Sequence, residues 1–232
     1  MSDSSSLVPQ HLGLILDGNR RWARERGLAL MEGHKVGYEN LKTIARAAFD
    51  QGVSYVSAYV FSTENWNRSK AEVSYLMRLL MWVLKHEVEV MHRDGIRLRV
   101  IGSKLRLGAA MVKAIHEAEK KTEHNQHGTL LLCLNYGGQQ EIVEATKRVV
   151  AAGYTPEQIT PDLLNQFLYA PDVPPVDLLI RTSGEQRLSN FMLWESAYSE
   201  LLFTKLNWPA FSPADLRAAL DEYANRQRRF GK

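Results

Sequence analysis

Residues 11–23 read HLGLILDGNRRWA, and this stretch is the most informative in the chain. A short apolar run ends on Asp17, a Gly-Asn pair follows, and Arg20 and Arg21 come next. The order predicts a strand, a tight turn and the start of a helix. Ligands of α/β proteins collect beyond the carboxyl ends of strands, and a helix start beside arginines suits a phosphate. Asp17 would repel that phosphate unless a divalent cation lay between them, which predicts a magnesium-assisted phosphate site. The competing interpretation is a strand-end turn with solvated arginines.

The composition is that of an ordinary globular protein and argues against several other classes. The chain has 232 residues, 45% hydrophobic and 24% charged, so it can bury a sizeable core as one domain. A net charge of +3 is too small to indicate nucleic-acid binding. The single cysteine, Cys133, allows no internal disulfide and favours a cytoplasmic location. The polar start predicts no signal peptide, and the most apolar window, residues 75–84, is too short to be an integral membrane segment.

Apolar runs alternate with helical patterns along the chain. The alternation predicts one α/β domain over residues 11–232, with a mainly parallel central sheet flanked by helices. Residues 1–10 are expected to form a disordered tail. Strands are expected at 11–16, 54–60, 96–101, 129–134, 176–180 and 201–203, and helices at 34–51, 71–93, 105–123, 138–152, 160–168 and 212–229.

The expected helix at 71–93 is apolar on two opposite faces. One face carries Leu76, Leu80 and Val83, and the other carries Leu79 and Trp82. A helix that is apolar all round has to be covered on both sides. The segment is therefore either a central buried helix or a helix with one face lining a pocket for an apolar ligand.

Two polar loops follow other expected strands. Residues 61–68 read FSTENWNR, a dense set of functional groups in a position where binding loops gather. Residues 181–190 read RTSGEQRLSN, and two arginines six positions apart can hold a diphosphate by bidentate hydrogen bonds. The competing interpretations are a loop with Trp66 packed against the core and a surface loop in which Arg187 pairs with Glu185.

A second carboxylate, Glu200, precedes the last apolar run and could complete a magnesium site with Asp17. In isolation a solvated glutamate is the simpler interpretation. The joint occurrence of these groups near strand ends is more informative than any one of them. Together they predict arginine-rich anion sites, a metal pair and an apolar pocket, which suit a substrate with a diphosphate head and a hydrocarbon tail.

The chain resembles the cis-prenyltransferases, which include undecaprenyl diphosphate synthase and short-chain Z-farnesyl diphosphate synthases. The motifs that carry the resemblance are HLGLILDGNRRWA, GHKVG, YVFSTENWNR, NYGG, IRTSGEQRLSNFMLWESAYSEL and RQRRFG, from His11 to Gly231. The resemblance implies a transferase of isoprenoid biosynthesis with isoprenoid diphosphate substrates, a hydrophobic substrate tunnel and Mg²⁺ as cofactor. It also implies a homodimer, in which the ending at residues 229–231 would complete the neighbouring subunit's site.

The resemblance assigns roles to individual residues. Asp17 and Asn65 are the expected catalytic residues, and Asp17 and Glu200 the expected metal ligands. A neutral amide is a feeble base, so we expect Asn65 to orient a diphosphate or water that takes the proton. The expected tunnel residues are Val60, Leu80 and Val83. The expected substrate-binding residues are Gly18, Asn19, Arg20, Arg21, Trp22, His34, Ser62, Thr63, Glu64, Trp66, Arg68, Arg181, Arg187, Leu188 and Ser189.

The chain departs from the family pattern at several positions. Leu30 replaces an arginine that contacts the allylic diphosphate, Gln139 replaces the arginine after NYGG, and Glu195 replaces a frequent glutamine. Val60 and Val83 are bulkier than the alanines of long-chain members, which predicts a short product. Two reactions stay open: head-to-tail addition of isopentenyl diphosphate, and irregular head-to-middle condensation of allylic diphosphates such as dimethylallyl diphosphate, of the lavandulyl type.

Two other classes of function agree less well with the residues of the chain. A non-catalytic partner subunit would not need Asp17, Arg181, Arg187 and Glu200, which are all present. A nucleic-acid-binding module could use the basic ending at residues 226–229, but the net charge is small and a stacking motif is absent.

Overall fold

A six-stranded parallel sheet organises the computed structural model, which describes residues 8–226. The strand order is β3-β4-β2-β1-β5-β6, so the chain runs from β1 to one side of the sheet and later returns to the other side of β1. Ligands of open α/β sheets bind beyond the carboxyl ends of the strands at such a switch point. The strands are β1 His11–Ile15, β2 Tyr55–Ser62, β3 Ile96–Ile101, β4 Gly128–Tyr136, β5 Leu178–Arg181 and β6 Glu200–Phe203.

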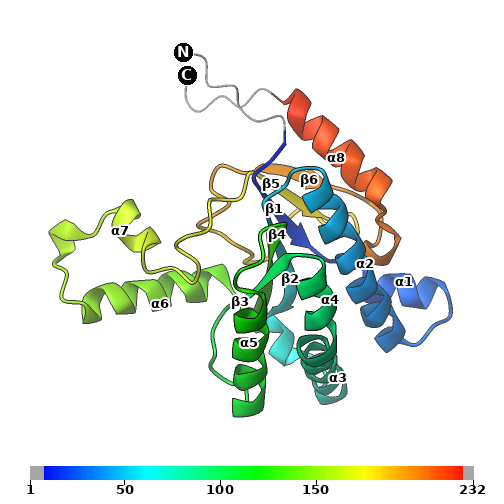
Figure 1. The fold of residues 1–232 in the computed structure, drawn as a ribbon, viewed down its shortest axis with the longest axis horizontal. Helices are drawn as coiled ribbons and strands as arrows, with labels where there is room; N and C mark the ends of the chain where they lie inside the picture. Colours follow the sequence, from blue (N-terminus) through cyan, green and yellow to red (C-terminus); the bar gives the residue numbers. More distant parts are fainter. Residues whose placement is uncertain (1–7, 227–232) are drawn as a thin grey trace.

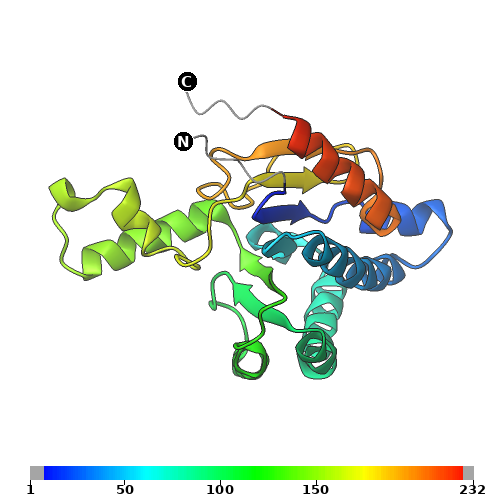
Figure 2. The same cartoon turned by 45° about the horizontal axis from the view of Figure 1, so that its top comes forward.

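Helices cover one face of the sheet, and an irregular segment covers the other (Figures 1 and 2). The main core joins strand residues such as Leu130 to side chains of α2, α3, α5 and α8. On the other face Phe191 and Met192, from the chain between α7 and β6, pack with Leu131 and Cys133. Helices α6 and α7 extend away from the sheet (Figure 1). The helices are α1 Asn19–Glu25, α2 Leu30–Asp50, α3 Lys70–Trp82, α4 Val88–Arg93, α5 Ala109–Thr122, α6 Gly138–Ala151, α7 Pro161–Asn165 and α8 Pro213–Asn225.

The predicted fold class is confirmed: a single α/β domain with a parallel sheet flanked by helices. Cys133 is buried in the core, as its apolar run indicates. Within residues 8–226, no helix combines the length and the hydrophobicity that a membrane crossing requires.

The predicted tail is wrong at its carboxyl end. The Gln10 N–H donates to the Asp177 carboxylate at 2.9 Å, and the Gln10 carbonyl accepts hydrogen bonds from Ser54 and Tyr55. Residues 8–10 therefore belong to the folded domain, while residues 1–7 lie outside the described range.

Several predicted helices have different bounds in the structure; α5 begins at Ala109 and not at 105, and α7 ends at Asn165 and not at 168. The first long helix begins earlier, at Leu30, because the Glu32 carboxylate accepts the Ala29 N–H at 3.0 Å and caps it. The predicted helix at 71–93 is divided by a π-helical turn, Val83–Glu87, between α3 and α4. Such turns often occur at functional sites. The last helix ends at Asn225, and residues 227–232 lie outside the described range.

Two carboxyl groups, Glu141 and Glu195, lie together in the interior. Glu141 is 1% exposed, and it accepts hydrogen bonds from the Tyr136 hydroxyl and, at 2.9 Å, from the Tyr169 N–H. Glu195 has a buried oxygen without a hydrogen-bond partner. Burial and the neighbouring Glu141 raise the pKa of Glu195 to about 8, so the pair holds one proton at neutral pH.

We predict that Glu195→Gln makes the stability of the protein less dependent on pH. The Glu195 carboxyl ionises near its usual pKa of 4.5 in the unfolded chain and near 8 in the folded protein. The folded state therefore loses stability as the pH rises from about 4.5 to 8. Thermal unfolding should give the variant a Tm at least about 2 °C higher than the parent at pH 8.5, with the difference shrinking as the pH falls. The control is Glu117→Gln on the surface of α5; a gain at every pH would contradict the interpretation.

Candidate active site

Asp17 follows β1 and pairs with the last residue of the adjacent β5. Its Oδ2 accepts a hydrogen bond from Arg181 Nη2 at 2.9 Å, and its Oδ1 accepts the Gly18 N–H at 2.8 Å. The Thr182 hydroxyl donates to the Asp17 carbonyl at 2.7 Å. The Arg181 side chain is 5% exposed, so Asp17 neutralises a charge that would be costly to bury alone.

The turn after Asp17 requires glycine. Gly18 has a φ of +101°, in the left-handed region that favours glycine. A Cβ atom at Gly18 would lie 2.4 Å from Asn207 Oδ1 and 2.8 Å from Ser183 Oγ. The Asp17 turn is therefore held against the loops that follow β5 and β6.

Two glycines of the GHKVG motif let α2 approach the start of α1. A Cβ atom at Gly33 would lie 2.2 Å from the Asn19 carbonyl oxygen, and one at Gly37 would lie 2.2 Å from Asn19 Oδ1. His34 lies between these two glycines in the sequence, so the close approach brings it beside Arg20. The two glycines of the motif therefore have a geometric role.

A buried carboxylate, Glu72 in the first turn of α3, gathers three cationic or polar side chains. Glu72 is 6% exposed. It accepts a hydrogen bond from Arg68 Nη1 at 2.8 Å, lies 3.3 Å from His34 Nε2, and lies 3.6 Å from Arg20 Nη1. Burial and the neighbouring Arg68 lower the pKa of His34, so its imidazole is neutral at neutral pH. The three side chains come from α1, α2 and the loop after β2.

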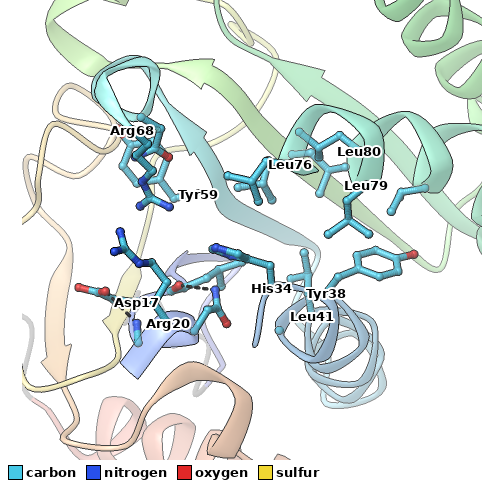
Figure 3. Close-up of a pocket in the computed structure, with 18 of the residues that line it drawn as sticks. Asp17, Arg20, His34, Tyr38, Leu41, Tyr59, Arg68, Leu76, Leu79 and Leu80 are labelled. Atoms are coloured by element: carbon cyan, nitrogen blue, oxygen red, sulfur yellow. Dashed lines mark hydrogen bonds between the residues drawn. The ribbon is translucent and has the colours of Figure 1, made fainter. Parts of the chain in front are cut away.

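A cavity of about 360 Å³ begins at these groups and continues between α2 and α3 (Figure 3). Asp17, Arg20, His34 and Arg68 lie at one end. The other end is apolar and is lined by Tyr38, Leu41, Leu76, Leu79, Leu80 and Val83. Leu76, Leu80 and Val83 of one predicted apolar face line the pocket together with Leu79 of the other face, which favours the sharper of the two interpretations. The second face is only partly covered, since Trp82 is 43% exposed.

A second cavity, of about 530 Å³, adjoins the first. Arg181, Ser189 and Asn190 line it, together with Ser62 and Glu64. Both cavities are bordered by Leu16, Asp17, Tyr59, Asn65 and Arg68. Molecules bound in the two cavities would therefore meet at Asp17 and Asn65.

Most of the predicted site residues line one of these cavities, but five predicted substrate-binding residues line neither. The first cavity includes Asp17, Gly18, Asn19, Arg20, Arg21, His34, Val60, Asn65, Arg68, Leu80 and Val83. The second includes Asp17, Ser62, Glu64, Asn65, Arg68, Arg181 and Ser189. The residues that line neither are Trp22, Thr63, Trp66, Arg187 and Leu188.

Structural contacts occupy three of these five side chains. Trp66 Nε1 donates to Asn135 at 2.7 Å, and the Arg106 guanidinium lies 4.5 Å from the centre of the Trp66 ring. Arg187 pairs with Glu185 at 2.7 Å, as the simpler interpretation of that loop states. The Trp22 ring is covered by Arg26, 4.4 Å from its centre.

The predicted metal pair is not brought together within one chain. Glu200 pairs with Leu178 at the beginning of β5, whereas Asp17 contacts Arg181 at its end. Three residues of strand separate the two levels, roughly 10 Å. Glu200 instead forms an ion pair with Arg226 at 2.8 Å. The spacing in the sequence did not show that the two carboxylates lie toward opposite ends of the strands.

Sequence reasoning missed three residues that shape the site. Glu72 stands four positions after Arg68, a spacing at which helical charges meet, and this signal was available. Tyr59 borders both cavities, but within β2 nothing distinguishes it from a core residue. Asn190 lines the second cavity and donates to Glu64 at 3.0 Å, a contact between loops far apart in the sequence.

Comparison with known proteins shows which family this chain is similar to. Residues 15–231 match the family model described as putative undecaprenyl diphosphate synthase. An isoprenyl transferase of Clostridium perfringens is 45% identical, with 97% of this chain and 90% of the relative covered. A trans,polycis-polyprenyl diphosphate synthase of Thermobifida fusca, specific for (2Z,6E)-farnesyl diphosphate, is 46% identical, with 97% and 81% covered. The crystal structure of lavandulyl diphosphate synthase from Lavandula x intermedia with dimethylallyl diphosphate has a TM-score of 0.93 at 37% identity and covers 98% of this chain and 100% of that one.

We predict that Gly37→Ala weakens both the fold and anion binding. The new methyl group meets Asn19 and has to push α2 away from α1, at a cost of about 1–3 kcal/mol. Tm should fall by several degrees, and the Kd for inorganic diphosphate, measured by calorimetry, should rise because Arg20 and His34 separate. The matched control is Gly108→Ala, where nothing lies within 4 Å of the new atom. Equal behaviour of the two variants would contradict the role assigned to the motif.

Proposed function

This chain belongs to the cis-prenyltransferase family and is an isoprenyl diphosphate synthase, and we propose that it joins an allylic isoprenoid diphosphate to a second five-carbon diphosphate, giving a short-chain prenyl diphosphate. One observation carries the proposal: two cavities with cationic linings meet at Asp17, and the first continues into an apolar end. The first cavity suits the allylic substrate, with its tail between α2 and α3. The second suits the diphosphate of the other substrate.

The polar end of the first cavity suits the departure of a diphosphate. Arg20, His34 and Arg68 surround the head-group position and stabilise the charge that develops on the leaving group. Departure makes the allylic carbon electrophilic, the double bond of the second substrate attacks it, and loss of a proton ends the step. The leucine-lined end excludes water that would quench the cation.

Asn65 lies where the two substrates would meet. Its Oδ1 accepts the Ser62 N–H at 3.1 Å, so the amide oxygen is already engaged. The amide NH₂ can still donate to a phosphate oxygen or a water. Because a neutral amide is a feeble base, we propose that Asn65 orients the diphosphate or water that takes the proton.

Asp17 fits Mg²⁺, the proposed cofactor. Mg²⁺ is usually held by one or two carboxylates together with substrate phosphates and not by an all-protein cage. Asp17 borders both cavities with a side chain 33% exposed, and residues 8–226 contain no cluster of three His, Cys, Asp or Glu that could hold a metal. When bound, the ion would stabilise charge on the departing diphosphate. Glu200 could bind the same ion only from a second subunit, so its proposed role as a metal ligand requires the proposed homodimer.

The volume of the first cavity supports a short substrate. A dry cavity of about 150 Å³ accepts one benzene, so 360 Å³ accepts about fourteen non-hydrogen atoms. Dimethylallyl diphosphate has that size, and farnesyl diphosphate is much larger. Val60 and Val83, the predicted tunnel residues, line this volume.

An irregular head-to-middle condensation of two allylic diphosphates is the alternative. Two observations support it. Leu30 supplies no cation where family members have an arginine for the allylic diphosphate, which changes how the two substrates compete for the sites. The lavandulyl diphosphate synthase structure, which was solved with dimethylallyl diphosphate, matches this chain over nearly its whole length.

A cytoplasmic location, supported by the single buried cysteine, completes the proposal.

We predict that Asp17→Asn lowers kcat/KM at least about 100-fold, because the variant removes the charge that holds Arg181 and the proposed metal. Product formation should be measured by mass spectrometry over a range of Mg²⁺ concentrations. Asp162→Asn, on the exposed side of α7, is the control for loss of a carboxylate elsewhere. Unchanged turnover in Asp17→Asn would refute the proposed site.

The product assay distinguishes the two reactions. The protein is incubated with dimethylallyl diphosphate alone and with added isopentenyl diphosphate. Head-to-tail coupling gives condensed product only with isopentenyl diphosphate, whereas irregular coupling gives it from dimethylallyl diphosphate alone. We expect products of about two isoprene units, because the cavity volume matches a five-carbon allylic diphosphate. Long products of the C50 class would contradict the short-chain proposal.

A further inference from the structure

We propose that Tyr38 forms the end wall of the apolar cavity and limits the length of the hydrocarbon tail that it accepts, an inference that rests on the function proposed above. His34, Tyr38 and Leu41 lie on one face of α2 and line the same cavity. Each four-residue step along a helix advances about 6 Å. Tyr38 therefore lies one turn beyond His34, at the end of the cavity far from Asp17 (Figure 3).

Contacts of α2 with α3 and with the π-helical turn Val83–Glu87 run from the polar end of the cavity to beyond its apolar end. His34 lies beside Glu72 at the polar end. One turn further along α2, the rings of Tyr38 and Trp82 meet edge to face, with centroids 6.4 Å apart. After another turn, Lys42 pairs with Glu87 at 2.9 Å. The cavity thus has charged groups at its head and Tyr38 at its tail, and the ion pair lies one helical turn beyond Tyr38.

Tyr38 is fixed in this position from two sides. Lys42 Nζ lies 5.1 Å from the centre of the Tyr38 ring, and Trp82, which packs on Tyr38, itself stacks on His86. The Tyr38 hydroxyl is buried. Burial and the nearby Glu87 raise the pKa of Tyr38, so the phenol stays neutral. A longer tail would press against the Tyr38 ring and its buried hydroxyl, an unfavourable contact for hydrocarbon.

The position of Tyr38 differs from that of the valines in the cavity wall. Val83 is 2% exposed and belongs to the main core, so a smaller residue there enlarges the cavity only within the core. Tyr38 instead separates the cavity from Trp82, which is 43% exposed. Removal of the Tyr38 ring therefore extends the cavity toward the surface between α2 and α3, where a longer tail can continue.

The test compares Tyr38→Ala with Tyr38→Phe. The measured quantity is the ratio of kcat/KM for geranyl diphosphate to that for dimethylallyl diphosphate, because any unfolded fraction cancels in this ratio. Each allylic substrate is supplied with isopentenyl and with dimethylallyl diphosphate as the second substrate. Tyr38→Ala should raise the ratio at least about tenfold, and Tyr38→Phe should leave it within about twofold of the parent.

Trp82→Ala provides a second measurement at a half-exposed position, where the fold tolerates the change, and it should raise the ratio in the same direction. An unchanged ratio in Tyr38→Ala, or an equal rise in Tyr38→Phe, would overturn the inference about Tyr38. The proposed function would still be supported as long as the parent protein forms condensed product. Absence of any condensed product from the parent itself would overturn both.

Discussion

The ion pair between Asp17 and Arg181 is the interaction on which the site depends. It joins the ends of two adjacent strands, β1 and β5, on either side of the point where the strand order changes direction. A nearly buried arginine needs a counter-charge, and Asp17 supplies it while remaining partly exposed to both cavities. The same carboxylate thus stabilises the fold and faces the place where two diphosphates would meet. Gly18 makes this possible, because only glycine fits the turn beside Asn207 and Ser183.

Three further arginines of the site are also held by carboxylates of the protein. Glu72 holds Arg20 and Arg68, and Glu185 holds Arg21 at 3.1 Å. At these arginines an entering diphosphate would therefore exchange one anionic partner for another. This arrangement keeps the arginines ordered before the ligand arrives, which lowers the entropic cost of binding. It also means that the affinity for the ligand is the difference between two sets of charge-assisted hydrogen bonds, not their sum.

Residue patterns predicted the architecture and most of the site for a common physical reason. Parallel strands place their carboxyl ends at one edge of the sheet, so the polar segments after β1, β2 and β5 had to converge. What local patterns do not carry is the partner of each side chain. The resemblance assigns Trp66 to the substrate site, and within the chain its indole N–H donates to the buried Asn135. The resemblance also pairs Glu200 with Asp17, and within one chain strand register puts the two carboxylates at different levels.

Sequence patterns were sufficient to predict the α/β class, the carboxylate and arginines of the Asp17 turn, and the apolar character of the helix after β2. These follow from local periodicity and from residue chemistry, which do not depend on distant contacts. Tertiary packing was needed to show that Glu72 pairs with Arg20 and Arg68, that Glu200 pairs with Arg226, and that Tyr38 lines the apolar end of the cavity. Each of these depends on how two elements far apart in the sequence pack, and packing is set by side-chain volume and register between elements, which no single segment of the chain contains.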